Sequence, residues 1–190
     1  MSSIARLRQQ PNLKTNNPIQ EVLVSNRMLF VDTPKGQNMT RKTNHEEAVV
    51  SEAIAAHWKE IYVQNDMAYD DSSVGVITPF RSQIAMIKSH LFFENHDYIT
   101  IDTIERYQGG ARDRIIISLT VNDANLLESI SNVNDEGLDR KLNVALTRAR
   151  EHIVILGNKD ILQKNPTYAR LIAYCTKVSA HQFTAENEQS

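Results

Sequence analysis

Two cations near the carboxyl end of the chain, Lys141 and Arg148, have the spacing of residues that could bind a phosphate. If residues 139–150 form one helix, seven residues at 100° each bring these side chains within about 20° of each other. They would lie beside an apolar stripe that we expect to pack on a sheet, formed by Leu138, Leu142, Ala145, Leu146 and Ala149. An arginine held on a packed helix is rigid enough to reach an anionic ligand on a neighbouring surface. The alternative interpretation of the pattern is a solvated basic face.

A second group of polar residues, Thr78, Arg81 and Thr103, lies at the ends of predicted strands or in the turns that follow them. Ligands of open α/β sheets bind beyond the carboxyl ends of the strands. Hydroxyl groups and an arginine at this edge suit contacts to the phosphates of a single nucleic-acid strand, which position the strand without reading its sequence. The alternative for Thr103, and for Ser82, is a turn or cap residue; Arg81 is the strongest of these candidates.

The sequence has no phosphate-binding loop with which to bind a nucleotide by itself. None of the six glycines, at positions 36, 75, 109, 110, 137 and 157, fits the Gly-x-x-x-x-Gly-Lys-Ser/Thr pattern of a phosphate-binding loop. The six histidines have no metal-ligand spacing with the one cysteine. Asp135 and Glu136 follow a polar loop instead of a strand, and we do not interpret them as a magnesium site. We therefore predict no metal site in this chain.

The elements that must position these residues alternate between strand and helix. Strands are predicted over residues 28–33, 74–78, 98–101, 114–119 and 152–157, and helices over 44–63, 81–92 and 139–150. A polar loop is expected over 122–137, and two short helices flank Pro166. About five alternations predict an open, mainly parallel sheet between two layers of helices. We expect a partly disordered lead-in over residues 1–27, one α/β domain over 28–178 and a flexible tail over 179–190.

Composition is typical of a globular intracellular domain. A chain of 190 residues is long enough for one domain with a core, and its formal net charge of −2 gives no overall attraction to nucleic acid. Any such binding must use a local patch of cations. A single cysteine cannot form an internal disulfide, no apolar run is long enough to span a membrane, and the first residues lack a signal peptide. We expect a cytoplasmic protein.

Three strings of the sequence resemble known motifs, in the order in which one family carries them. The string RKLNVALTRAR over residues 140–150 resembles motif VI of superfamily 1 helicases of the nonsense-mediated-decay-factor type. The string IDTIERYQG over 101–109, followed by DRIIIS over 113–118, is similar to motif V of this group, and GVITPFRSQ over 75–83 is similar to motif IV. The resemblance covers about residues 29–176.

The resemblance implies a RecA-like fold and the second of two motor domains, with ATP and Mg²⁺ bound in the cleft between them. The first domain would supply the phosphate-binding loop and the acidic pair for Mg²⁺. This chain would supply an arginine finger, which the motif places at Arg148, with Lys141 or Arg150 as substitutes in a shifted alignment. Gln108 and Gly109 match the motif V pair beside the nucleotide. The family usually reads Gln-Gly-Arg-Glu or Gln-Gly-Arg-Asp at these four positions, with the acidic residue near the ribose of ATP. This chain has Gly110 and Ala111 in place of the last two residues, so contact with the ribose would need another carboxylate such as Asp113.

Two functions from different classes follow from these patterns. The first is the second motor domain of an ATP-dependent DNA or RNA helicase, with single-stranded nucleic acid and a phosphate-loop domain as partners and negligible ATP hydrolysis alone. The second is a catalytically inactive helicase-like module that binds nucleic acid or protein, which the Gly110-Ala111 departure favours. A phosphate-loop domain in the same polypeptide would favour the first.

Overall fold

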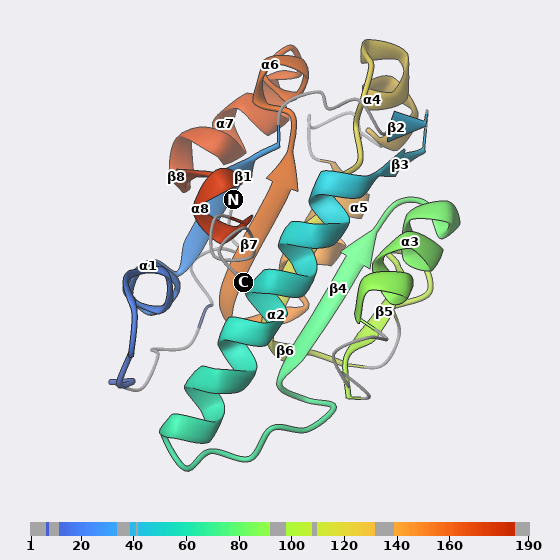
Figure 1. Cartoon of the computed structure of the whole chain (residues 1–190). Coiled ribbons are helices and arrows are strands. Elements are labelled where there is room, and N and C mark those ends of the chain that lie inside the picture. Colours follow the sequence, from blue (N-terminus) through green and yellow to red (C-terminus); the bar gives the residue numbers. More distant parts are fainter. Residues whose placement is uncertain are drawn as a thin grey trace.

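The computed structural model describes residues 7, 12–33, 39–40, 42–91, 98–107, 110–131 and 139–184. At the centre of this described part is a six-stranded sheet in the order β5-β4-β6-β7-β1-β8 (Figure 1). All its neighbouring strands run parallel. The strands are β1 (Met28–Asp32), β4 (Val74–Thr78), β5 (Thr100–Thr103), β6 (Arg112–Ser118), β7 (Ala149–Gly157) and β8 (Thr176–Ser179). A separate antiparallel pair, β2 (Met39–Thr40) and β3 (Thr43–Asn44), precedes the longest helix.

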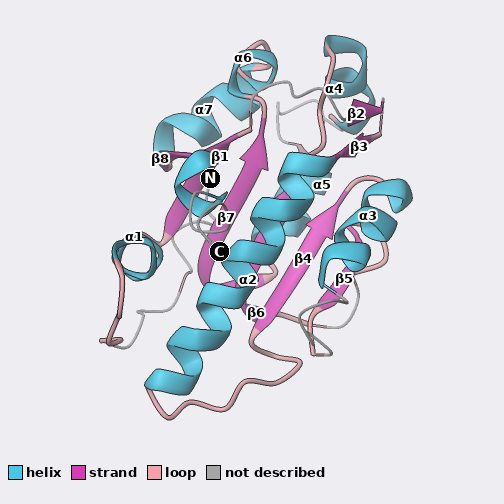
Figure 2. Ribbon diagram, in the orientation of Figure 1, coloured by secondary structure: helices cyan, strands magenta, loops and turns pink. Residues whose placement is uncertain are grey.

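Helices cover both faces of the sheet (Figure 2). One layer contains α1 (Pro18–Ser25), α2 (His45–Gln64), α3 (Arg81–Leu91) and α8 (His181–Thr184). The other layer contains α4 (Ala124–Ile130), α5 (Arg140–Leu146), α6 (Lys159–Leu162) and α7 (Pro166–Tyr174). The predicted three-layer α/β architecture with a parallel sheet is thus confirmed.

The strand sequences explain the two layers, because successive side chains of a strand point to opposite faces. In β6, Ile116 packs with the α2 layer, while its neighbours Ile115 and Ile117 pack with the α5 layer. In β7, Val154 and Ile155 divide in the same way. Strands covered on both faces must be apolar at every position, which is the pattern of the central strands here.

Most helices begin at a side chain that caps their free N–H groups. Asn44 accepts from the N–H of Glu47 at 3.1 Å to start α2, and Asp139 accepts from that of Leu142 at 3.1 Å to start α5. Helices α1 and α7 begin with Pro18 and Pro166, because proline at this position loses no helical hydrogen bond.

The largest difference from expectation concerns the segment with the two cations. The predicted helix over 139–150 ends at Leu146, and Ala149 already belongs to β7, opposite Arg112 of β6. The N–H of Arg112 donates to the Arg148 carbonyl at 2.8 Å. Because the backbone here pairs with β6, it cannot also form the hydrogen bonds of a longer helix. The apolar stripe is confirmed for Leu142, Ala145 and Leu146, which are buried; Leu138 lies outside the described residues.

Ordered elements also occupy segments expected to be irregular. Helix α1 lies in the expected lead-in, where Leu23 is buried in the core. Helix α4 lies in the expected polar loop and starts at the capping side chain of Asp123. Strand β8 and helix α8 extend the fold beyond residue 178, and Phe183 of α8 packs in the core. No helix in the described part is long and apolar enough to cross a membrane.

Candidate functional site

The predicted site residues fall at the two opposite edges of the parallel sheet. Arg148 lies at the amino-terminal edge, immediately before β7. Thr78 and Thr103 are the last residues of β4 and β5 and stand opposite each other at the carboxyl-terminal edge. Gln108 and Gly109 lie outside the described residues. The nucleotide candidate Arg148 and the nucleic-acid candidates therefore occupy different ends of the sheet.

The backbone of Arg148 is fixed by hydrogen bonds, whereas its charge has no carboxylate partner among the described residues. Its N–H donates to the Ala145 carbonyl at 3.2 Å, and its own carbonyl accepts from Arg112. The side chain is half-buried, and its Nε atom is buried with no hydrogen-bond partner. No carboxylate of the described residues forms an ion pair with it. A half-buried guanidinium without an acid is suited to an anionic ligand from outside the chain.

The other two finger candidates of the same segment, Lys141 and Arg150, already have carboxylate partners. Lys141 Nζ lies 2.8 Å from Glu105 Oε1, and the hydrogen bond from Lys141 lowers the pKa of Glu105. Arg150 Nη1 lies 3.2 Å from Asp113 Oδ1. Of the three candidates for the finger, Arg148 is therefore the only one that has no acid partner among the described residues.

Lys141 and Arg148 do not share a helix face, contrary to the sequence prediction. Lys141 lies in the first turn of α5, whereas Arg148 follows the last turn. Seven residues of helix correspond to about 10 Å along the axis. Lys141 instead pairs with Glu105, which lies two residues beyond the carboxyl end of β5. The first turn of α5 therefore lies on that side of the sheet.

Tyr107 packs against Gly75 of β4 and lies beside Arg112. The Tyr107 ring lies 5.7 Å from the guanidinium carbon of Arg112, and its hydroxyl is buried without a hydrogen-bond partner. Burial raises the pKa of Tyr107 to about 12, although the nearby charges of Arg112 and Arg148 lower it, so the phenol stays neutral. A Cβ atom on Gly75 would lie 1.8 Å from the Tyr107 hydroxyl, which explains the glycine at this strand position.

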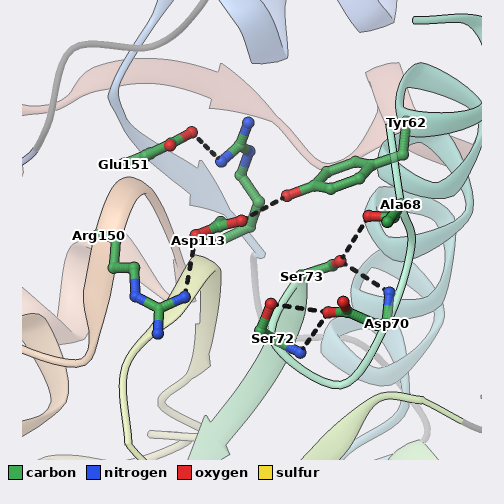
Figure 3. A network of polar contacts seen from close by, with 9 residues as sticks. Tyr62, Ala68, Asp70, Ser72, Ser73, Asp113, Arg150 and Glu151 are labelled. Carbon is green, nitrogen blue, oxygen red and sulfur yellow. Dashed lines mark hydrogen bonds and ion pairs between the residues drawn. The ribbon is translucent and has the colours of Figure 1, made fainter. Parts of the chain in front are cut away.

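Asp113, the proposed substitute for the missing ribose carboxylate, is occupied by other groups (Figure 3). Its Oδ2 atom accepts a hydrogen bond from the Tyr62 hydroxyl at 3.1 Å, and its Oδ1 atom accepts from Arg150. A ribose would have to displace one of these partners. Gly110, by contrast, has a φ of 88°, a conformation that favours glycine over the arginine usual in the family.

Of the three nucleic-acid candidates Thr78, Arg81 and Thr103, only Arg81 is exposed. The side chain of Thr78 is fully buried and its Oγ1 accepts from the Phe80 N–H at 3.5 Å. Thr103 is 6% exposed, and its carbonyl accepts from the N–H groups of Arg106 and Tyr107. The two threonines thus shape the turns after their strands, whereas Arg81 is the first residue of α3 and its side chain is exposed.

A buried polar cluster behind this edge was not predicted as such. The Glu47 carboxylate, fully buried, accepts from Ser118 Oγ at 2.7 Å and from the Thr120 N–H at 3.0 Å. Gln83 donates to the Asn44 carbonyl at 2.9 Å and to Ser118 at 3.2 Å. Burial raises the pKa of Glu47 to about 7, although the hydrogen bonds that its carboxylate accepts lower it. The cluster fixes the start of α3, which carries Arg81, to α2 and β6; its sequence signal is Asn44-x-x-Glu47, a cap followed by an acid.

Comparisons with known proteins agree with the motifs. A family model described as "AAA domain" matches residues 4–160. Regulator of nonsense transcripts 1 from Dictyostelium discoideum is 37% identical over 107 residues, which cover 53% of this chain and 8% of that protein. The DNA replication ATP-dependent helicase/nuclease DNA2 from Gallus gallus is 29% identical over 109 residues, or 54% of this chain and 10% of that protein.

Among solved structures, the C-terminal domain of a possible DNA helicase from Lactobacillus plantarum has a TM-score of 0.43 at 14% identity, covering 83% of this chain and 91% of that one. The chain spans only 8% and 10% of the length of the two curated relatives. The family match covers most of the chain, including the three motifs. The chain belongs to the AAA-domain family, and its sequence is similar to the C-terminal, RecA-like domain of superfamily 1 helicases of the nonsense-mediated-decay-factor type.

Proposed function

We propose that this chain is the second motor domain of an ATP-dependent nucleic-acid helicase and supplies Arg148 as an arginine finger. One observation carries the proposal: of the three motif VI cations that are candidates for the finger, Lys141 and Arg150 have carboxylate partners, whereas Arg148 has none among the described residues and its Nε atom is buried. The orphaned, buried Nε of Arg148 fits a nucleotide phosphate as its missing partner. ATP would be bound mainly by a first RecA-like domain that contains the phosphate-binding loop.

The role of Arg148 in this proposal is electrostatic. Charge accumulates on the oxygens of the transferring phosphoryl group, and a guanidinium aimed at them stabilises the transition state, with an effect of about 10³–10⁵ in rate in other enzymes. The described residues contain no group of three His, Cys, Asp or Glu side chains that could hold a metal, and Asp135 and Glu136 lie outside them. From the resemblance to the family, we assign Mg²⁺ to the acidic pair of the first domain, where it would neutralise the phosphate charges.

The carboxyl-terminal edge is the proposed path of single-stranded DNA or RNA. Arg81 is exposed at the start of α3, and Thr78 and Thr103 support the adjacent strand ends from below the surface. Contacts of this kind bind phosphates and tolerate any base sequence. The buried free thiol of Cys175 fits a reducing compartment, and we propose the cytoplasm as the location.

The alternative is an inactive helicase-like module. Two observations favour it: Gly110-Ala111 replaces the usual arginine and acid of motif V, and Asp113 is already bonded to Tyr62 and Arg150. Both weaken the contact expected for the ribose of ATP. Neither affects Arg148, so we retain the motor domain as the first proposal.

Hydrolysis assays separate the two functions. The purified chain alone should hydrolyse ATP no faster than buffer, and adding the phosphate-loop domain, in the same polypeptide or in trans, should produce hydrolysis that single-stranded nucleic acid stimulates. In that assembly Arg148→Ala should lower kcat by at least about 10³ while nucleotide binding is largely retained. Lys141→Ala serves as the matched control, since its cation is engaged by Glu105. Hydrolysis by the chain alone, or full turnover by Arg148→Ala, would refute the proposal.

A further inference from the structure

The strand that follows Arg148 contains a β-bulge. Arg112 of β6 stands opposite Ala149 of β7, but Arg114 stands opposite His152, so β7 has one residue more than β6 over this interval. Arg150 and Glu151 together therefore face the single residue Asp113. Such bulges re-aim the strand and are found next to active sites, although they are rare in parallel pairs.

Both residues of the bulge form ion pairs with β6 (Figure 3). In one pair β7 supplies the base, and in the other β7 supplies the acid. Arg150 pairs with Asp113, and Glu151 pairs with Arg114. We propose that Asp113, Arg114 and Glu151 are positioning residues, whose ion pairs lock the bulge and thereby fix the direction in which Arg148 leaves the sheet. The inference rests on the proposed role of Arg148 and extends it to residues outside motif VI.

The Asp113 pair connects the bulge to two further elements. Asp113 also accepts from the Tyr62 hydroxyl of α2, and its N–H donates to the Ser72 carbonyl at 2.9 Å. Burial raises the pKa of Tyr62, so this phenol remains a hydrogen-bond donor. Asp113 is thus held from α2, from the loop before β4 and from β7 at once, which leaves its carboxylate little freedom.

The Arg114 pair is more deeply buried. The Arg114 side chain is fully buried, with its guanidinium carbon 4.4 Å from the Trp58 ring centroid and 5.4 Å from that of Tyr62. Such rings attract a cation, but in the described part of the chain Glu151 is its only carboxylate partner. Because a buried unpaired charge is strongly unfavourable, Arg114 requires Glu151 to stay where it is. The bulge cannot relax without breaking this pair.

Three contacts to β6 fix the chain from Arg148 to Glu151. The Arg148 carbonyl accepts from the Arg112 N–H, Arg150 is held by Asp113, and Glu151 is held by Arg114. On the other side, α5 ends two residues earlier at Leu146. Arg148 therefore projects from a short segment fixed at both ends, which is what a residue needs if it must meet a ligand held by another domain.

The test measures the order of the Arg148 side chain in the isolated chain by ¹⁵N relaxation of its Nε–Hε group, assigned by its loss in Arg148→Lys. Wild-type Nε should show an order parameter near the value of about 0.85 that is typical of rigid groups, and Asp113→Asn and Glu151→Gln should lower it below about 0.6. Glu105→Gln, which breaks the ion pair of Lys141 instead, should leave Arg148 rigid. Exchanging the charges in Asp113→Arg with Arg150→Asp should restore order lost in Asp113→Asn.

A rigid Arg148 in both single variants would overturn the inference. If Glu151→Gln does not fold because Arg114 loses its partner, the double variant Arg114→Met with Glu151→Met keeps the volume and removes both charges. A mobile Arg148 in that folded variant supports the ion pairs as the positioning device, and a rigid one refutes it. In the assembly with the phosphate-loop domain, the variants should lower kcat with KM unchanged; a mobile Arg148 with normal kcat would refute the finger and leave the positioning intact.

Discussion

Gly75→Ala is the substitution whose effect follows most directly from the distances in this fold. The new Cβ would lie 1.8 Å from the Tyr107 hydroxyl oxygen, about 1.6 Å short of the 3.4 Å at which ordinary contact begins. Tyr107 cannot swing away easily, because its ring is buried and its N–H donates to the Thr103 carbonyl at 2.9 Å. Overpacking of a core typically costs 1–3 kcal/mol, and we expect the upper end, about 3 kcal/mol.

The companion variant Tyr107→Phe identifies the cause. Alone, it removes a buried hydroxyl that has no hydrogen-bond partner, so it should leave the free energy of unfolding unchanged or raise it by about 1 kcal/mol. Combined with Gly75→Ala, it removes the closest atom but leaves the ring carbon Cζ at 2.9 Å from the new Cβ. The double variant should therefore recover about half of the loss, a coupling of about 1–2 kcal/mol.

Urea unfolding of the four proteins in this cycle measures the coupling, provided that their m-values agree. Gly157→Ala is the matched control: its Cβ would meet the terminal methyl group of Leu162 at 2.7 Å, a smaller overlap than the 1.8 Å at Gly75. If Gly75→Ala is no more destabilising than Gly157→Ala, or if Tyr107→Phe rescues nothing, the packing argument for Tyr107 is wrong.

Three further outcomes are expected. Arg81→Ala should weaken binding of single-stranded oligonucleotides of any sequence and reduce the slope of log K against log salt by about 0.7; an unchanged slope would remove Arg81 from the path. The raised pKa of Glu47 means that its stabilising contribution is complete below about pH 4.5 and is lost as pH rises to about 7, by at most about 3 kcal/mol. Unfolding at several pH values should show a smaller loss over this window in Glu47→Gln, and equal slopes would contradict the assignment. Asp123→Ala should cost about 1 kcal/mol in unfolding through the lost cap of α4, with hydrolysis in the assembly unchanged.

The sequence predicts the layers of this fold better than its site. Apolar strands and alternating helices identify a parallel sheet, because burial on both faces needs a continuous apolar run. Strand β8 escapes prediction because its sequence TKVS is mostly exposed at the sheet edge. The helix with Arg148 was predicted too long, since helical periodicity is local whereas the pairing of Ala149 with Arg112 joins segments far apart in sequence.

The same limit applies to the charged residues. The motif identifies Arg148, but its distinction from Lys141 and Arg150 depends on Glu105 and Asp113, which only the folded chain brings near them. Arg114 at a strand start gives no sign that it is fully buried between two rings of α2. Local pattern can nominate a cation, whereas tertiary contacts decide whether its charge remains available.

The placement of the two candidate sites at opposite ends of the strands sets how they can communicate. Strand β6, with seven residues from Arg112 to Ser118, spans about 20 Å between the edges. No side chain bridges that length, and a hydrogen-bonded sheet covered on both faces does not bend to transmit a small shift. If Arg148 meets ATP and Arg81 binds nucleic acid, as we propose, a force on Arg148 would reach Arg81 by rotation of the whole domain. The rigidity of the sheet would then set how far the nucleic acid moves for each ATP.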